Sequence, residues 1–206
     1  MPLSSIPSWA KRRKARHPRE TAPVAERKLA EIAHRLKQVR LLAMDVDGVL
    51  TDGRLSIDSN GVEQKSFHVA DGLGLVALKR CGIDIVWISG RVSGAVRKRA
   101  AELGIGNLLE NIGDKGSALT SVLTALAVQQ EQAAYIGDDW NDLPAFHAVG
   151  IRIAVSNGSA EILDAADAVT MKPGGYGAVR EVCDEILAAQ DSRAAALDLY
   201  LRALVE

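Results

Sequence analysis

The stretch that decides the fold is Leu41-Leu42-Ala43-Met44-Asp45-Val46-Asp47-Gly48-Val49-Leu50-Thr51-Asp52-Gly53. An apolar run of strand length is followed by two carboxylates, Asp45 and Asp47, then by a glycine and a polar turn. Alternate side chains of a strand share a face, so the two carboxylates lie together only while the chain stays extended. We expect Gly48 to end the strand. Buried strands of parallel sheets are continuously apolar, and ligands bind at their carboxyl ends. The stretch therefore predicts a reaction centre, with two solvated loop aspartates as the alternative.

Composition and charge narrow the class of protein. The chain has 206 residues and is 48% hydrophobic, which indicates one globular domain with a substantial core. Residues 1–40 carry eleven Lys or Arg and three Asp or Glu, a net charge of +8, whereas the remainder carries 14 and 23, a net charge of −9. An acidic body argues against a nucleic-acid-binding domain, because the basic residues of such a domain lie on its folded surface. Cys81 and Cys183 are too few for a disulfide framework, and no apolar run approaches the ~18 to 20 residues of a membrane span. A cytoplasmic protein without a membrane span is expected.

The order of apolar and polar segments predicts the organisation of the chain. Residues 1–23 hold four of the six prolines and the run Lys11-Arg12-Arg13-Lys14-Ala15-Arg16, which predicts a disordered basic arm before a folded domain over 24–206. Within 53–70, Asn60-Gly61 between alternating segments predicts a β-hairpin flap. Beyond the opening strand, further strands are expected at about 84–88, 107–110, 132–136, 150–154 and 168–170. Helices are expected at about 24–39, 72–81, 92–103, 114–128, 141–148, 159–165, 175–189 and 192–204. This alternation predicts an α/β fold with a doubly wound, Rossmann-like parallel sheet and helices on both faces.

Three further polar clusters follow predicted strands or open predicted helices. They are Ser89-Gly90-Arg91, Gly113-Asp114-Lys115-Gly116 and Gly137-Asp138-Asp139-Trp140-Asn141-Asp142. With residues 45–52 they would meet at one edge of the sheet. Over residues 41–190 the four clusters resemble the motifs of the haloacid dehalogenase superfamily, here D-V-D-G-V-L-T-D, I-S-G-R, the helix start at Lys115 and G-D-D-W-N-D. The resemblance implies phosphoryl transfer.

The physical logic of that chemistry gives each residue a role. A carboxylate can attack phosphorus and divide the reaction into two easier steps, so Asp45 is the expected nucleophile. A second carboxyl group can protonate the leaving alkoxide and then deprotonate water, which fits Asp47. The Ser89 hydroxyl and the Lys115 ammonium can stabilise charge on the phosphoryl oxygens.

The same resemblance implies a Mg²⁺ cofactor, since aspartates beside a phosphate dianion require a hard cation between them. It implies that Asp45, the backbone carbonyl of Asp47 and Asp138 hold the ion. Asp139 and Asp142 would orient waters and Lys115 around it. For Asp142 a role at a helix N-terminus is the alternative.

The spacing of the motifs excludes a cap domain. Only 44 residues separate Asp45 from Ser89 and 26 separate Ser89 from Lys115. Either the substrate is macromolecular or another subunit covers the site. A narrower resemblance favours the second option: V-L-T-D-G, S-F-H-V-A-D-G-L-G, G-D-D-W-N-D-L-P and P-G-G-Y-G-A-V-R-E-V-C are similar to the capless family of 3-deoxy-D-manno-octulosonate 8-phosphate phosphatases.

That family resemblance implies a homotetramer, in which flap hairpins and the tail loop at about 172–180 complete active sites between subunits. It makes Gly90, Arg91 and Arg180 the expected substrate-binding residues, because arginine presents a planar donor fork to carboxylate or phosphate. The alternatives are that Arg91 caps a turn and that Arg180 lies on a helix surface. Relatives often have basic residues where Ala70 and Tyr176 stand, which leaves the exact sugar acid open.

The family resemblance implies hydrolysis of an eight-carbon sugar acid 8-phosphate through an aspartyl-phosphate, in lipopolysaccharide precursor biosynthesis. A nine-carbon sugar acid 9-phosphate is one alternative substrate. A polynucleotide or other macromolecular phosphate is another, using the basic arm. A non-catalytic regulatory module is the remaining hypothesis, and it would be expected to lack one of the aspartates or the lysine.

Overall fold

The opening strand lies at the centre of a six-stranded parallel sheet. The computed structural model describes residues 28–203. The sheet has the order β5-β4-β1-β6-β7-β8, with every neighbouring pair parallel. Its strands are β1 (Leu41–Met44), β4 (Asp84–Ile88), β5 (Asn107–Leu109), β6 (Ala133–Gly137), β7 (Ile151–Ala154) and β8 (Ala168–Val169). The chain runs outward from β1 to β5 and then returns to β6 on the other side of β1, so the winding reverses between β1 and β6. The predicted doubly wound α/β fold is confirmed.

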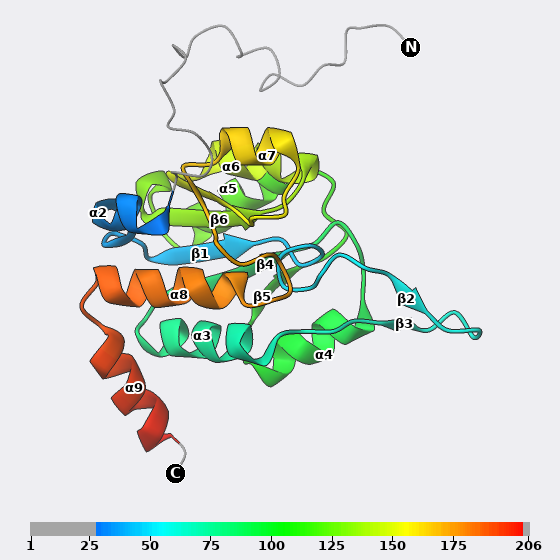
Figure 1. Ribbon diagram of the computed structural model, residues 1–206, viewed down its shortest axis with the longest axis horizontal. Coiled ribbons are helices and arrows are strands. Elements are labelled where there is room, and N and C mark those ends of the chain that lie inside the picture. Colours follow the sequence, from blue (N-terminus) through cyan, green and yellow to red (C-terminus); the bar gives the residue numbers. More distant parts are fainter. Residues whose placement is uncertain (1–27, 204–206) are drawn as a thin grey trace, which may run out of the picture.

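Helices cover both faces of the sheet (Figure 1). One face carries α3 (Val69–Arg80), α4 (Gly94–Glu102) and α8 (Ala178–Ala189), with α9 (Arg193–Arg202) packed against α3 and α8. The other carries α5 (Lys115–Ala125), α6 (Leu143–Ala148) and α7 (Ala160–Ala165). Short one-turn pieces precede several elements: η4 (Leu29–Ile32), α2 (Ala33–Leu36), η5 (Gln130–Gln132) and η6 (Trp140–Asp142).

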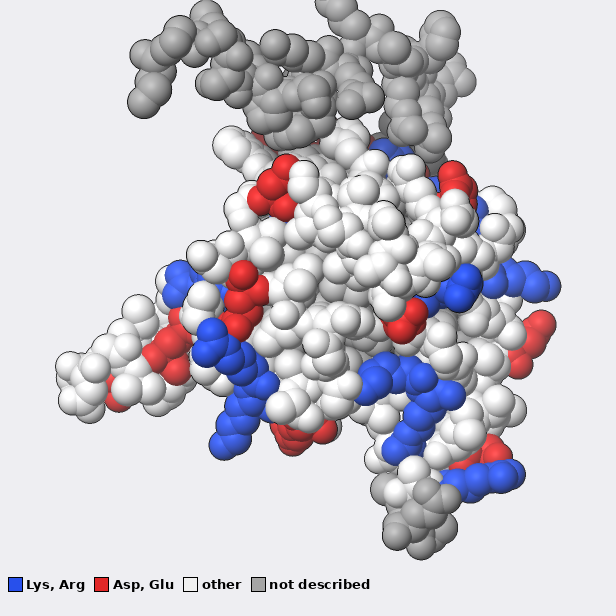
Figure 2. Space-filling model, turned by 180° about the vertical axis from the view of Figure 1, so that it is seen from behind, with Lys and Arg blue, Asp and Glu red and all other residues white. Residues whose placement is uncertain are grey.

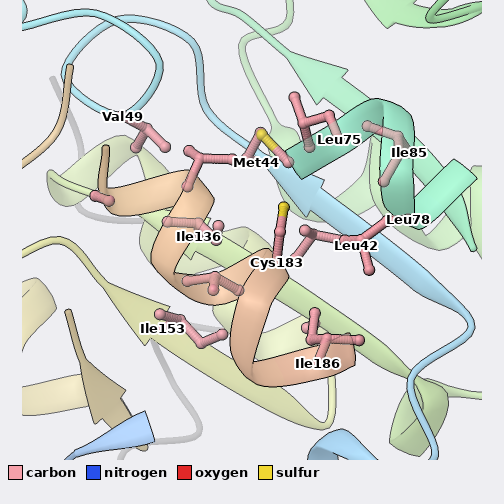
Figure 3. Packing of buried hydrophobic residues seen from close by; sticks show 14 of the residues in the cluster. Leu42, Met44, Val49, Leu75, Leu78, Ile85, Ile136, Ile153, Cys183 and Ile186 are labelled. Atoms are coloured by element: carbon pink, nitrogen blue, oxygen red, sulfur yellow. The ribbon is translucent and has the colours of Figure 1, made fainter. Parts of the chain in front are cut away.

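The core has two parts because side chains of β1 alternate between the faces. Leu42 and Met44 pack with Cys183 and Ile186 of α8 and with Leu75 of α3 (Figure 3). Leu41 and Ala43 pack on the opposite face in the cluster under α5, α6 and α7. All four residues of β1 are fully buried. Each large aliphatic side chain so buried contributes roughly 1.5–3 kcal/mol, so β1 is held rigidly on both sides.

The hairpin is short and projects from the body (Figure 1). β2 (Ser56–Ile57) and β3 (Glu63–Gln64) pair antiparallel around the loop at 58–62. The Asp58 side chain accepts hydrogen bonds from the amides of Asn60 and Val62, which holds this loop in shape. We call residues 53–68 the flap.

Several predicted element boundaries differ from the structure. The helix expected at 24–39 is, in its described part, η4 followed by the single turn α2. Helix α3 begins at Val69 rather than 72, and α4 begins after the extended Ser93. Helix α8 begins at Ala178 rather than 175, because Gly175 and Gly177 have positive φ angles of 76° and 95°. The arm predicted at 1–23 lies outside the described residues. Among residues 28–203 there is no helix with the length and apolar character needed to cross a membrane.

Candidate active site

The two carboxylates of the opening stretch lie at the carboxyl end of β1, where the winding reverses. Asp45 follows the last strand residue and is 4% exposed. Its Oδ1 accepts a hydrogen bond of 2.7 Å from the Val46 amide. Asp47 is half-buried beside it, and both residues line a cavity of about 580 Å³. Seven of the predicted site residues line this cavity: Asp45, Asp47, Ser89, Gly90, Arg91, Asp138 and Asp139.

Gly48 leaves the space that allows the Asp138 side chain to approach Asp45 and Asp47. Asp138 follows β6, which is paired in register with β1 through Met44 and Ile136. Gly48 has φ +93°, and a Cβ placed there would lie 2.0 Å from Asp138 Oδ2. A side chain at position 48 would therefore occupy the space that the Asp138 carboxylate uses.

Lys115 lies behind the cavity as the first residue of α5. Its side chain is 1% exposed, and its Nζ is 2.8 Å from Asp45 Oδ2 and 2.7 Å from Asp142 Oδ1. Asp142 is fully buried and also accepts hydrogen bonds from the Tyr135 hydroxyl at 2.7 Å and the Asp138 amide at 2.9 Å. The Asp142 side chain accepts a hydrogen bond from the backbone amide at the N-terminus of η6 and also one from Lys115. It therefore combines the predicted role beside Lys115 with the alternative role at a helix N-terminus.

Burial and charge shift the ionisation of this cluster. Burial, with the charge of Asp142, raises the pKa of Asp45 to about 7 although Lys115 opposes the shift. Burial and the charges of Asp142 and Asp45 raise the pKa of Asp138 to about 8. Burial alone would lower the pKa of Lys115, but the two aspartates outweigh it and the pKa is raised. Crowded carboxylates need a further positive charge to be ionised together.

The donor set fits a hard divalent cation. Carboxylate oxygens of Asp45, Asp138 and Asp142 lie within 4.8 Å of one another. Asp142 is fully buried and does not line the cavity, whereas Asp45 and Asp138 do, so Asp45 and Asp138 are the carboxylates placed to hold an ion. Gly48 leaves the space that brings Asp138 to them. The predicted ligand set of Asp45, Asp138 and the Asp47 carbonyl is therefore compatible with the structure.

Of the remaining predicted residues, Ser89 and Asp139 line the cavity and Arg180 does not. Ser89 follows β4, is buried, and its Oγ accepts a hydrogen bond of 3.1 Å from the Arg91 amide. Asp139 caps η6 at the rim of the cavity, where its Oδ1 accepts a hydrogen bond of 2.8 Å from the Trp140 amide. Arg180 is not brought to the cavity of its own chain. Its guanidinium pairs with Asp184 at 2.9 Å on α8, so within one chain the helix-surface alternative describes it.

Comparison with known proteins places this site in a family. A model of haloacid dehalogenase-like hydrolases matches residues 100–180. The 3-deoxy-D-manno-octulosonate 8-phosphate phosphatase of Yersinia pestis is 42% identical over 179 residues, which cover 87% of this chain and 94% of the relative. The chain belongs to the 3-deoxy-D-manno-octulosonate 8-phosphate phosphatase family of haloacid dehalogenase-like hydrolases.

Solved structures of this phosphatase family agree in fold. The enzyme of Moraxella catarrhalis, in complex with magnesium ion, phosphate ion and 3-deoxy-D-manno-octulosonate, is 45% identical with a TM-score of 0.79, covering 82% of this chain and 98% of that one. The cobalt-bound phosphatase of Haemophilus influenzae is 42% identical with a TM-score of 0.76, covering 79% and 98%. The predicted resemblance to this family is confirmed.

Sequence reasoning missed several residues of the phosphatase site. Ser159 and Glu161 line the cavity beside Trp140 and Asn141 of the predicted G-D-D-W-N-D cluster, and Trp140 Nε1 donates a hydrogen bond of 2.7 Å to Glu161. From the flap, Lys65 contacts Asp47, and Glu63 contacts Arg91. The alternation of residues 63–67 in an extended strand could have placed Glu63 and Lys65 on one face. Nothing in the sequence indicated that this face would turn toward the site.

Proposed function

We propose that the protein is a Mg²⁺-dependent phosphomonoesterase that hydrolyses 3-deoxy-D-manno-octulosonate 8-phosphate to the free sugar acid and phosphate, a step toward lipopolysaccharide. The observation that carries the chemistry is the convergence of Asp45 and Asp47 on one cavity, with Lys115 fixed behind Asp45. The identity to phosphatases of this sugar acid over almost their full length supports the substrate.

In the proposed mechanism Asp45 attacks phosphorus while the ester oxygen of the substrate leaves. Asp47 donates a proton to that oxygen, so the products of the first step are an aspartyl-phosphate and a neutral hydroxyl group. Asp47, now ionised, removes a proton from water, which attacks phosphorus and regenerates Asp45. Ser89 and Lys115 bind phosphoryl oxygens. Lys115 also holds the Asp45 carboxylate in place throughout the reaction. Asp142 keeps the Lys115 ammonium against Asp45.

Mg²⁺ would be held by Asp45, Asp138 and the backbone carbonyl of Asp47, with Asp139 at the rim to orient its waters. The chemistry that a bound Mg²⁺ supplies is charge neutralisation, which allows the phosphate dianion to approach ionised Asp45. Gly90 and Arg91 would contact the substrate, since both line the cavity. Arg180 would reach substrate only in the site of a neighbouring chain.

We further propose a homotetramer and a cytoplasmic location. The projecting flap and the open cavity support assembly, because a neighbouring subunit could cover the site, over which residues 28–203 form no cap domain. Free Cys81 and Cys183 suit a reducing compartment.

The test is phosphate release from a panel of substrates, with Mg²⁺ and with excess chelator. We expect the highest kcat/KM for the eight-carbon 8-phosphate, and loss of turnover on metal removal. Asp45→Asn should lower kcat by at least about 10³-fold, since it removes the nucleophile. Asp52→Asn is the matched control, because an Asn there can still accept the Arg54 amide as Asp52 does.

Each alternative has a distinct outcome in the same assay. A higher kcat/KM for a nine-carbon 9-phosphate or a phosphorylated oligonucleotide would overturn the proposed substrate. Substantial Mg²⁺-dependent turnover by Asp45→Asn would overturn the aspartyl-phosphate mechanism.

A further inference from the structure

The returning arm of the flap is attached to the active site of its own chain. Along residues 62–68 the side chains alternate, with Glu63, Lys65 and Phe67 partly buried and the residues between them exposed. The Phe67 ring stacks on Trp87 with centroids 6.5 Å apart and planes at 12°. Trp87 is a fully buried residue of β4, so the arm is anchored to the sheet. The arm therefore differs from the exposed tip of the flap.

Lys65 carries its charge into the site. Its side chain is only 1% exposed, and the ammonium group donates a hydrogen bond to Asp47 Oδ1. A second carboxylate oxygen, Glu63 Oε1, lies 3.4 Å from the same nitrogen. A lysine ammonium is rarely buried unless carboxylates surround it, so these contacts fix both the flap arm and the Asp47 side chain.

Glu63 contacts two cationic side chains, Lys65 and Arg91, that lie on either side of Asp47, and we call it the brace between them. Its carboxylate accepts hydrogen bonds of 2.6 Å from Arg91 Nη2 and 2.7 Å from Ser93 Oγ. Arg91 Nε is 3.9 Å from Asp47 Oδ2, on the opposite oxygen from Lys65. Each oxygen of Asp47 thus faces one cation, and Glu63 contacts both cations.

We propose that Lys65 is a positioning residue, which orients the Asp47 carboxyl group for proton transfer to the leaving oxygen, with Glu63 as its brace. The flap thereby completes the active site of its own chain, apart from any role between subunits. This inference rests on the proposed function, because it assigns Lys65 to the acid–base step of that reaction. Lys65 itself neither gains nor loses a proton.

The role predicts a dependence on the leaving group. In the first step the bond from phosphorus to the ester oxygen breaks, and the proton moves from Asp47 to that oxygen. A sugar alkoxide needs this proton, whereas p-nitrophenolate leaves without it. The ratio kcat/KM covers only steps up to the first irreversible one, which is formation of the aspartyl-phosphate. A misplaced Asp47 should therefore impair alkyl phosphates and spare p-nitrophenyl phosphate.

The experiment compares Lys65→Met with Gln64→Met. Both variants place the same side chain on the returning arm of the flap, but Gln64, the last residue of β3, lies on the exposed face. We expect Lys65→Met to lower kcat/KM for the sugar acid 8-phosphate by about 10²-fold, the usual order for a misplaced catalytic group, and for p-nitrophenyl phosphate by less than about 3-fold. Gln64→Met should leave both values unchanged. Lys65→Arg, which keeps the cation, should recover part of the loss, and Glu63→Gln should show the same selectivity.

Two outcomes would overturn the inference. Equal losses on both substrates, carried mainly by KM, would make Lys65 a phosphate-binding residue. Unchanged values in Lys65→Met would remove any role in the reaction. The proposed function fails separately: wild-type enzyme that prefers another alkyl phosphate overturns the substrate, while the alkyl-to-aryl comparison still decides the role of Lys65.

Discussion

At the scale of single residues, Gly48 is required both for its backbone conformation and for the space it leaves. We predict that Gly48→Ala lowers kcat by at least about 10²-fold and raises the Mg²⁺ concentration needed for half-maximal activity, because the new Cβ would displace Asp138. The φ of +93° adds strain of about 1–2 kcal/mol for any L side chain. Enzyme kinetics over a Mg²⁺ titration measure both effects.

Gly61→Ala separates these two causes. Gly61 also has a positive φ, +78°, but a Cβ built there meets nothing within 4 Å. It should share the backbone strain and keep wild-type Mg²⁺ dependence. If Gly48→Ala behaved like Gly61→Ala, the geometric argument for Asp138 would be wrong.

Lys115 and Lys65 both lie at the active site, but only the position of Lys115 could be predicted from the sequence. Lys115 was predictable because it opens a helix after a strand, and parallel strands bring their carboxyl ends to one edge. Lys65 lies in a β-hairpin, and no comparable rule places the side chains of a hairpin at that edge of the sheet. Its direction depends on Phe67 packing against Trp87, a tertiary contact between residues 20 apart in sequence. The chemistry of the site was therefore predictable, and the support of Asp47 by the flap was not.

At the scale of elements, strand periodicity predicted the sheet well but helix starts were displaced. The segment before α8 has apolar and small residues compatible with a helix from 175. Gly175 and Gly177 instead take positive φ, and the Gly175 amide donates to the Val49 carbonyl at 2.9 Å. The tail loop is thus held against the turn after β1. Local propensity cannot anticipate a start set by such a distant partner.

Asp167, which lies just before β8 (Ala168–Val169), joins β7 to α2 and gives a pH-dependent prediction. Burial alone would raise the pKa of Asp167, but hydrogen bonds and charge from Arg152 on β7, with Arg35 on α2, lower it to about 2. A depressed carboxyl pKa stabilises the fold above the unfolded value of about 4, and this stability is lost as the pH falls toward 2. The contribution at neutral pH is about 2 kcal/mol.

We predict that Asp167→Asn is less stable than wild type by about 2 kcal/mol at pH 5 to 7, with a smaller difference at pH 3. Urea unfolding at each pH and a fixed protein concentration measures it. Asp198→Asn breaks an exposed pair with Arg202 on α9 and should change stability by less than about 1 kcal/mol. A difference for Asp167→Asn that grew as the pH fell would contradict the assignment.

At the scale of the whole molecule, the flap tip presents apolar surface without a partner in the described chain. Leu55, Ile57 and Val62 are 52%, 61% and 56% exposed. In Figure 2 the projecting hairpin ends in a mainly uncharged tip, while charged groups gather nearer its base. A pair of two-residue strands is marginally stable by itself, and exposed apolar patches mark interaction sites. These features support contact between flaps and neighbouring subunits.

We predict that wild-type enzyme has a mass near four times the 22.0 kDa of one chain in light scattering. The double variant Ile57→Ser with Val62→Ser should shift toward smaller species and lose activity, because neighbouring flaps would no longer cover the open cavity. Leu197→Ser, which makes a similar change at a 59% exposed site on α9, should leave mass and activity unchanged. A fully active wild-type monomer would remove the argument that subunits cap one another. If the double variant were monomeric but fully active, the flap tip would serve assembly alone, and the anchored arm with Lys65 would be the part of the flap that the reaction requires.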